Sequence, residues 1–216
     1  MFRTAVFAAA TLVFAVGCHV VQGNGVRGEE ERTVPAFDQI RVDDGLEVEV
    51  VVGEGASSRV VVTGDENVVG YVETEVRVGE LKVSMPWGAF DTRSPLKVVV
   101  ESPFVKTLEL NGGSRVTASG LNADRLSLSV YGGSNLGASG SCDALDLEVD
   151  GGGRALLREV STEQARVTVE GGSHAEVLVH QQIEIVATGG STLYVAGNPA
   201  RAVRVEQSGG AQIIVE

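Results

Sequence analysis

The residues of this 216-residue chain with the clearest capacity for chemistry are carboxylates. Asp43 and Asp44 are adjacent, and a second set lies near the middle of the sequence: Asp124, Asp143, Asp146 and Asp150. Two carboxylates that converge on a glycosidic oxygen can hydrolyse a polysaccharide, and a carboxylate-bound cation with a Lys or Arg base can serve a lyase. Acidic residues on a solvated strand face are the simpler explanation, so a carbohydrate-active enzyme stays the alternative interpretation.

Other catalytic chemistry has less support. His174 and His180 are six residues apart and have no Cys or carboxylate at zinc-ligand spacing, and His19 lies near the N-terminus. The sequence contains no Gly-x-Ser-x-Gly elbow, P-loop or dinucleotide fingerprint. The stretch DGGGR at 150–154 lacks the alternating Gly-x-Asp of Gly-rich calcium repeats. We therefore expect no cofactor and no metal.

The charge balance is strongly acidic. Seventeen Lys and Arg residues stand against 29 Asp and Glu residues, which gives a formal net charge of −12. Such a surface repels polyanions, and no basic stripe with interleaved aromatic residues is present. Nucleic acid is therefore excluded as a partner.

The N-terminus has the pattern of a lipoprotein signal peptide over residues 1–17. A short basic start precedes an apolar run from Ala5 to Val16, which is too short to span a bilayer comfortably. The ending FAVGC resembles the bacterial lipoprotein cleavage box, which predicts that Cys18 is lipidated and anchors the chain in the cell envelope. An ordinary secretory peptide is the alternative. Because His19 follows in place of the Asp that signals inner-membrane retention, the outer membrane is favoured in a Gram-negative source.

Residues 18–32 are rich in Gly and charge, which predicts a flexible tether, although Gly23-Asn24-Gly25 could instead form a first corner. The second cysteine, Cys142, has no partner once Cys18 is lipidated. We interpret Cys142 as a small core or corner residue.

From residue 33 onward, β-branched residues alternate with polar ones, which predicts strands throughout. Pairs of glycines interrupt these strands at intervals of 18 to 20 residues: Gly112-Gly113, Gly132-Gly133, Gly151-Gly152, Gly171-Gly172, Gly189-Gly190 and Gly209-Gly210. A period near twenty is typical of a solenoid with one coil per repeat. Glycine suits tight corners because it adopts positive φ without strain.

The register follows from apolar columns on both sides of each pair. Positions two, four and six before the first Gly are apolar except for Lys106 and Gln207, and positions four and six after it are all apolar. The same frame fits at Asp44-Gly45. Since a slip of one residue would turn each strand inside out, we predict an all-β, single-domain parallel β-helix over 33–216. Its first coils, over 33–101, are less regular than the repeats over 102–216.

A serine follows several of the pairs, namely Ser114, Ser134, Ser173 and Ser191. We expect these residues to form a column along one edge that makes structural hydrogen bonds at the surface, rather than a ligand site.

The sequence from Val34 onward resembles the auto-transporter adhesin, head GIN domain family. The resemblance rests on the segment from Val34 to Met85 and on the NGGS, YGGS and EGGS corners, and it extends to Glu216. The family's Gly-hydrophobic-acidic-Val step is present as Gly45-Leu46-Glu47-Val48, while Gly-Ile-Asn itself is absent. The resemblance implies a bacterial envelope β-solenoid with an adhesive role, and it transfers no catalytic or binding residue.

Together these features predict a lipid-anchored binding, adhesion or scaffolding module whose ligand is an envelope protein or a polysaccharide. The last coil ends in Ile213, Ile214 and Val215, a β-prone apolar run that predicts self-association or partner binding by strand addition.

Overall fold

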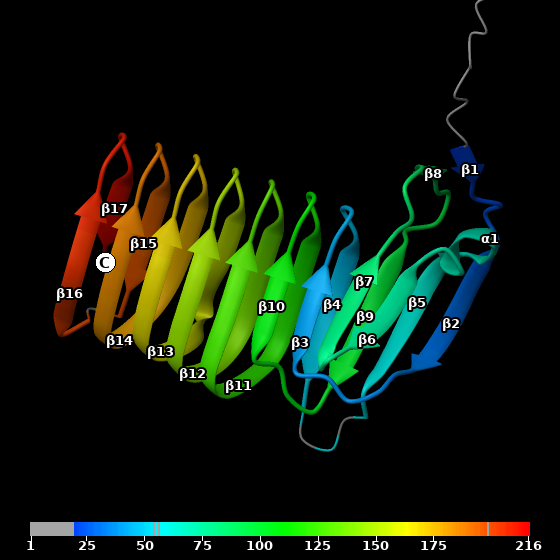
Figure 1. The fold of residues 1–216 in the computed structure, drawn as a ribbon, viewed down its shortest axis with the longest axis horizontal. Helices are drawn as coiled ribbons and strands as arrows, with labels where there is room; N and C mark the ends of the chain where they lie inside the picture. Colours follow the sequence, from blue (N-terminus) through cyan, green and yellow to red (C-terminus); the bar gives the residue numbers. More distant parts are fainter. Residues whose placement is uncertain (1–19, 54, 56, 198) are drawn as a thin grey trace, which may run out of the picture.

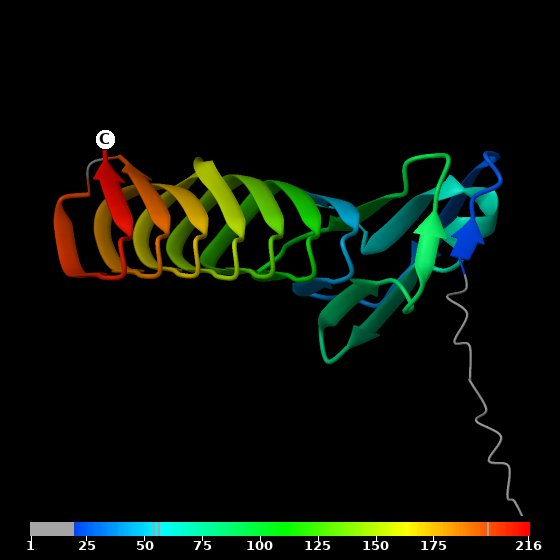
Figure 2. The ribbon, with the colours of Figure 1, turned by 90° about the horizontal axis from the view of Figure 1, so that it is seen from above.

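The structure is a computed structural model that describes residues 20–53, 55, 57–197 and 199–216. It confirms the predicted all-β solenoid, whose parallel, stacked coils make about five turns. Figure 1 shows the coils side by side along the long axis, and Figure 2 shows them from above as a flattened tube. The strands of the regular part are β10 (Thr107–Leu110), β11 (Arg115–Val130), β12 (Asn135–Val149), β13 (Arg154–Val169), β14 (His174–Ala187), β15 (Thr192–Ala196), β16 (Arg201–Gln207) and β17 (Gln212–Val215).

Each coil contributes to two walls. The front wall in Figure 1 consists of β3 (Gln39–Val42), β10, the C-terminal halves of β11 to β14, and β16. The back wall consists of β4 (Glu47–Val52), the N-terminal halves of β11 to β14, β15 and β17. Neighbouring strands within each wall are parallel and in register, as Leu108 pairs with Leu128 and Leu128 with Leu147.

The predicted apolar columns form the core. Leu108, Leu128 and Leu147 are fully buried, and each contributes about 1.5–3 kcal/mol of hydrophobic free energy by leaving water. Lys106, which interrupts the column, is exposed. Val205 in the last coil points into the same column but is 51% exposed, because no further coil packs over it in the described chain. An inward side chain is therefore fully buried only where a neighbouring coil lies on each side of its own coil.

The glycine pairs lie at the corners between the walls. Gly112 and Gly113 have φ values of 66° and 80°, and the amide of Ser114 donates to the carbonyl of Asn111 at 3.3 Å. Positive φ at both central residues is the pattern of a type I′ turn. In the first coil Asp44, with φ of 64°, takes the place of the first Gly and Gly45 that of the second. Asp is one of the few residues with a side chain that tolerates this conformation.

The expectation that the serine column lies at the surface is wrong. Ser114, Ser134, Ser173 and Ser191 are buried, because the residue after each Gly pair already points inward. The hydroxyl of Ser191 donates to the carbonyl of Val169 at 2.8 Å. That of Ser134 has no hydrogen-bond partner among the described residues. Ser114 Oγ donates to the carbonyl of Asn111 at 2.7 Å, and Ser173 Oγ accepts from the amide of Gly152 at 3.2 Å. Most of these hydroxyls therefore make the expected structural hydrogen bonds, but at buried positions.

At the N-terminal end the two walls diverge into separate arms (Figure 2). The front wall continues from β3 into β7 (Glu80–Ser84) and β6 (Glu73–Arg77), and the back wall from β4 into β9 (Lys97–Ser102), β5 (Arg59–Asp65) and β2 (Arg27–Thr33). A short helix, α1 (Glu66–Val69), buries Val68 and Val69 in this section. Strands β1 (Val20–Gln22) and β8 (Ala89–Asp91) form a separate parallel pair.

The structure contradicts the flexible tether predicted over 18–32 wherever it describes that segment. Residues 20–22 and 27–33 form β1 and β2, and β2 is antiparallel to β5. The sequence of β2, RGEEERT, has no apolar alternation because both of its faces carry charged groups. Its side chains are ordered by polar contacts, such as the ion pair of 3.1 Å between Glu31 and Arg59. Charged residues of this kind also protect an edge strand from unwanted pairing.

No helix among the described residues is long and apolar enough to cross a membrane.

Candidate functional site

A large hollow lies where the first corner meets the loop between β7 and β8. We call it the junction groove. It has a volume of about 650 Å³, and its lining includes Asp44, Glu47, Met85, Trp87, Phe90 and Arg115. Its lining combines apolar and aromatic side chains with charged groups, and sites that bind ligands commonly bring such groups together in a hollow.

Trp87 gives the junction groove its most unusual side chain. It is the only tryptophan of the chain, and it is 92% exposed. Exposure of so large an apolar group costs hydrophobic free energy that folding could have recovered. Phe90, three residues later, packs edge-on against Tyr71 with ring centroids 5.4 Å apart. Aromatic side chains therefore gather at this end of the molecule.

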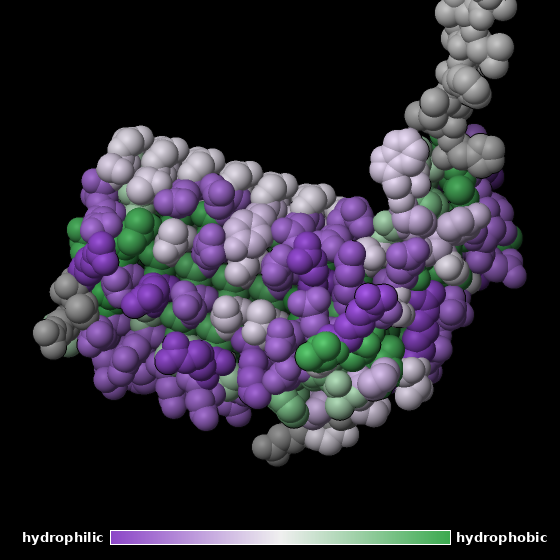
Figure 3. All heavy atoms as spheres, viewed as in Figure 1, coloured by the Kyte–Doolittle hydropathy of each residue, from purple (hydrophilic) through white to green (hydrophobic). Residues whose placement is uncertain are grey.

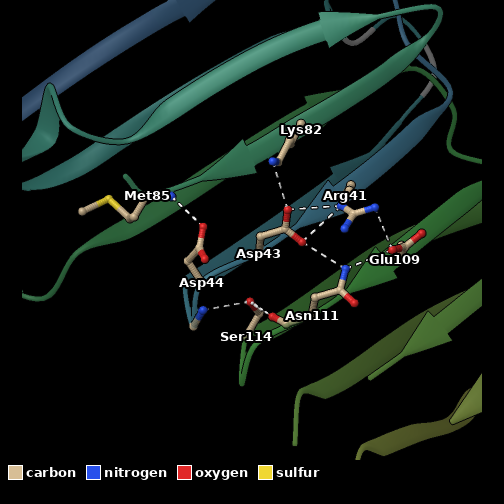
Figure 4. Close-up of polar contacts among 9 residues, drawn as sticks. Arg41, Asp43, Asp44, Lys82, Met85, Glu109, Asn111 and Ser114 are labelled. Atoms are coloured by element: carbon tan, nitrogen blue, oxygen red, sulfur yellow. Dashed lines mark hydrogen bonds and ion pairs between the residues drawn. The ribbon is translucent and has the colours of Figure 1, made fainter. Parts of the chain in front are cut away.

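A polar network fixes the elements around the junction groove (Figure 4). Asp43 accepts hydrogen bonds from Arg41 at 3.1 and 3.2 Å and from Asn111 at 3.0 Å, and it forms an ion pair of 3.4 Å with Lys82. Burial alone would raise the pKa of Asp43, but the bonds from Asn111 and Arg41 outweigh it and lower the pKa. The network joins β3, β7 and β10, so it ties one N-terminal arm to the regular coils.

The loop that carries Trp87 is itself attached to the first corner. The amide of Met85 donates to Asp44 Oδ2 at 3.2 Å, while the amide of Gly45 donates to Ser114 Oγ at 3.2 Å (Figure 4). Trp87 thus extends from a loop that is bonded to the solenoid two residues earlier.

A second candidate surface lies on the back wall. Gly137 has no side chain to cover β12, which leaves a hollow of about 270 Å³ whose lining includes Thr117, Ser139, Leu156, Arg158 and Glu159. Leu156 is 40% exposed at its margin. We call this surface the back-wall patch and include in it the neighbouring His174, Glu176 and Tyr194.

Charged and aromatic groups of the back-wall patch support one another. Arg158 pairs with Glu176 at 2.6 Å and with Glu216 at 2.9 Å, and its guanidinium lies 5.9 Å from the ring centre of Tyr194. Glu176 Oε1 also lies 3.0 Å from His174 Nε2. The hydrogen bonds of Glu176 with His174 and Arg158 lower the pKa of its carboxyl group. The front wall, which Figure 3 shows, is covered mostly by hydrophilic residues and carries ion pairs of its own, such as that of 3.0 Å between Arg166 and Glu184.

The sequence comparison with protein families matched residues 36–199 to the family described as "Putative auto-transporter adhesin, head GIN domain". The chain belongs to this family. This confirms the resemblance found in the sequence. No curated protein matched the chain.

Several solved structures are similar to this head GIN domain. A putative adhesin from Bacteroides fragilis matches with a TM-score of 0.76 at 16% identity, over 91% of this chain and 100% of that one. A putative adhesin from Parabacteroides merdae has a TM-score of 0.67 at 18% identity, covering 91% and 99%. A putative lipid binding protein from Parabacteroides distasonis has a TM-score of 0.56 at 18% identity, covering 91% and 100%. At these identities the likeness establishes the fold.

The candidate carboxylates of this head GIN domain are spread over different places. Asp43 and Asp44 meet at the junction but engage different partners, as described above. Asp124 and Asp143 occupy stacked positions in the middle of β11 and β12, at the bend opposite the glycine corners (Figure 1). Asp146 lines a shallow front-wall hollow with Arg166, and Asp150 caps its own corner by accepting from Gly151 at 2.6 Å. A general acid needs a raised pKa, and that of Asp43 is lowered.

The remaining candidate residues, Cys142 and His180, make contacts with neighbouring strands that favour a structural role. Cys142 is free and buried, with its sulfur 3.5 Å from Thr162 Oγ1, and burial raises the pKa of its thiol. His180 contacts Ser161 at 3.1 Å. No group of three or more His, Cys, Asp or Glu residues within the described chain is arranged to hold a metal ion. The predicted signal peptide, Cys18 and His19 lie outside the described residues.

Two features of the site were not identified from the sequence. Trp87, in the segment Met-Pro-Trp-Gly, is a lone tryptophan among turn residues, and that context could have indicated an exposed aromatic group. The back-wall patch consists of outward-facing residues from successive coils that become neighbours through strand pairing. The sequence would have indicated it if the outward positions of each coil had been aligned in the same way as the inward ones.

Proposed function

We propose that this head GIN domain is a lipid-anchored, non-catalytic binding module of the bacterial cell envelope that uses its back-wall patch to hold an envelope protein or a polysaccharide. The family and the similar adhesin structures support a binding or adhesion role in general terms. The observation that carries the finer proposal is the back-wall patch, where a half-exposed Leu156 lies beside a hollow and an ordered Arg158.

The rigidity of the wall supports this assignment. Outward side chains stand in rows about 4.8 Å apart on a sheet whose register is fixed by the core. A partner that contacts such a surface needs little reorganisation of the protein, so less binding free energy is lost to ordering. Arg158, held by two carboxylates and a tyrosine ring, is oriented before any partner arrives.

The anchor is supported by the cleavage-box sequence that ends in Cys18. Several acyl chains on one residue give a stable membrane attachment, whereas a single chain gives a reversible one. Replacing Cys18 with Ser should release the protein from membranes. If the variant still sediments with membranes after a high-salt wash, the lipid anchor is not what holds it.

The binding surface can be tested with matched variants. Full-length protein in detergent would be incubated with isolated envelope polysaccharide and, separately, with solubilised envelope proteins, and bound material would be measured. Leu156→Glu and Arg158→Ala should reduce binding at least several-fold. The control is Arg166→Ala, which removes an equivalent ion pair of 3.0 Å with Glu184 from the front wall of the same coils. Equal losses in Arg158→Ala and Arg166→Ala would contradict the proposal, and so would release of sugar fragments from the polysaccharide by the wild type, which would favour an enzyme.

A further inference from the structure

Trp87 lies close to the position of the predicted anchor. Strand β1 begins at Val20, two residues after Cys18, and Val20 pairs with Ala89 of β8. Trp87 precedes Ala89 by two residues. Two residues span at most about 7 Å and paired strands lie about 4.8 Å apart. The Cα atoms of Cys18 and Trp87 are therefore within about 20 Å of each other, whatever conformation the residues between Cys18 and Val20 adopt.

The surface at this end carries exposed apolar groups in addition to Trp87. Val20 is 51% exposed and Tyr71 is 43% exposed, and Tyr71 contacts Phe90. We call the three aromatic residues, Tyr71, Trp87 and Phe90, the anchor-end surface; Val20, which pairs with Ala89, lies on the opposite face of the β1–β8 pair from Phe90. Tyr and Trp are enriched at membrane interfaces, because their rings combine an apolar body with a polar N–H or O–H that bonds to headgroups and water.

From this geometry we infer that the anchor-end surface lies against the lipid bilayer, with the indole of Trp87 in the headgroup region. The inference rests on the proposed lipidation of Cys18, because that anchor keeps the surface within reach of the membrane. The decisive observation is that the chain is already in a paired strand at Val20. Only one residue separates β1, which pairs with β8, from the proposed lipid attachment at Cys18, so no long tether holds the domain away from the membrane.

The attachment of the loop allows Trp87 to orient the whole domain. Met85 is bonded to Asp44 at the first corner, and Gly23, directly after β1, donates to the carbonyl of Asp91 at 2.8 Å. Contact of Trp87 with lipid would therefore restrain the solenoid as well as the loop. The acidic net charge of −12 gives no attraction to anionic lipids, so the contact depends on the anchor and on apolar groups.

Because the chain has one tryptophan, its fluorescence reports on this surface directly. Full-length lipidated protein would be reconstituted into phosphatidylcholine vesicles made with or without brominated acyl chains, which quench an indole that lies in the bilayer interface. We expect strong quenching of Trp87 and a blue-shifted emission relative to the Cys18→Ser protein in solution. The control is the double variant Trp87→Phe, Phe104→Trp, which moves the indole to the exposed loop between β9 and β10, away from β1 and β8 (Figure 1). Its quenching should be several-fold weaker.

Each other outcome overturns the inference in a distinguishable way. If the protein is bound to vesicles but Trp87 remains unquenched, with the emission of a water-exposed indole, the membrane contact is absent while the anchor stands. If a neutral oligosaccharide shifts the emission of the vesicle-bound protein and brominated lipid does not, the junction groove is a saccharide site instead. If mass spectrometry finds no lipid on Cys18, the anchor and the inference fail together, and the back-wall patch is unaffected.

Discussion

The buried carboxylate of Asp65 accepts a hydrogen bond of 2.7 Å from the backbone amide of Arg93. It also accepts bonds from the amide of Gly25 at 3.0 Å, the amide of Ser94 at 3.2 Å and the hydroxyl of Ser94 at 2.9 Å. One side chain thereby joins the end of β5, the turn before β2 and the loop after β8. Burial would raise the pKa of Asp65, but these four donors outweigh it and lower the pKa.

The first prediction is that Asp65 makes the stability of the domain dependent on pH at the acidic end. A carboxyl group whose pKa is lower in the folded state stabilises the fold above its unfolded pKa of about 3.9, and the contribution is lost as the pH falls through the folded value. Thermal unfolding of the wild type and of Asp65→Asn would be followed from neutral to acidic pH. The variant should unfold at a lower temperature near neutrality, and the difference should shrink towards low pH. A difference that is constant with pH would argue against this assignment.

The second prediction separates the two glycines of a corner. A Cβ on Gly189 would lie 3.1 Å from the amide nitrogen of Gly171 in the preceding coil, whereas a Cβ on Gly190 would meet nothing within 4 Å. Both residues have positive φ. Gly190→Ala should therefore cost only the conformational strain, about 1 to 2 kcal/mol. Gly189→Ala should cost clearly more, because the coils must also separate. Denaturant unfolding would measure both, and equal costs would show that stacking does not restrict the first position.

The third prediction concerns the buried serines. Ser191 donates to the carbonyl of Val169 at 2.8 Å, so Ser191→Ala should lower stability by about 1 kcal/mol. The hydroxyl of Ser134 is buried without a partner among the described residues, and its removal should be neutral or stabilising. Thermal unfolding of the two single variants provides the comparison. If Ser134→Ala proves as costly as Ser191→Ala, a hydrogen bond to Ser134 has been missed.

The fourth prediction concerns self-association through the last coil. Strand β17 pairs with β15 on one side only within the described chain, Val215 is 60% exposed, and the side chains of Ile213 and Ile214 are half-buried. An unpaired apolar edge can recruit another strand, although a net charge of −12 opposes contact between copies. Light scattering of the Cys18→Ser protein should show oligomers that increase with salt and are abolished by Ile214→Lys. A monomer at high concentration and high salt would leave this edge without a role in self-association.

The regular coils could be predicted from the sequence because two independent signals agree there. Glycine pairs recur every 18 to 20 residues, and apolar columns such as Leu108, Leu128 and Leu147 keep one register relative to them. Each position in this part repeats the environment of the position one coil earlier. A single consistent alignment therefore determines the walls, the corners and the core together.

The N-terminal section could not be predicted in the same way. Strand β2 owes its place to main-chain pairing with β5 and to ion pairs such as Glu31 with Arg59, and neither leaves an apolar pattern in the sequence. The contact between β1 and β8 joins segments almost seventy residues apart. Burial of Ser134 could have been predicted from the register, because Ser134 lies two residues before the inward Leu136 and therefore on the same side of the chain.

The presence of Asp44 in the column of first-position glycines has a consequence for how such a molecule can vary in length. A Cβ on Gly112 or Gly189 would lie 3.1 Å from the amide nitrogen of the corner beneath it, whereas the layer beneath Asp44 is a loop, so a side chain is accommodated most easily at the first corner. The aspartate thus marks the start of the stack, while every later corner is equivalent to its neighbours. Coils can then be gained or lost by duplication or deletion of about twenty residues between the start and the last corner, each changing the length of the rod by about 4.8 Å and leaving the N-terminal arms untouched.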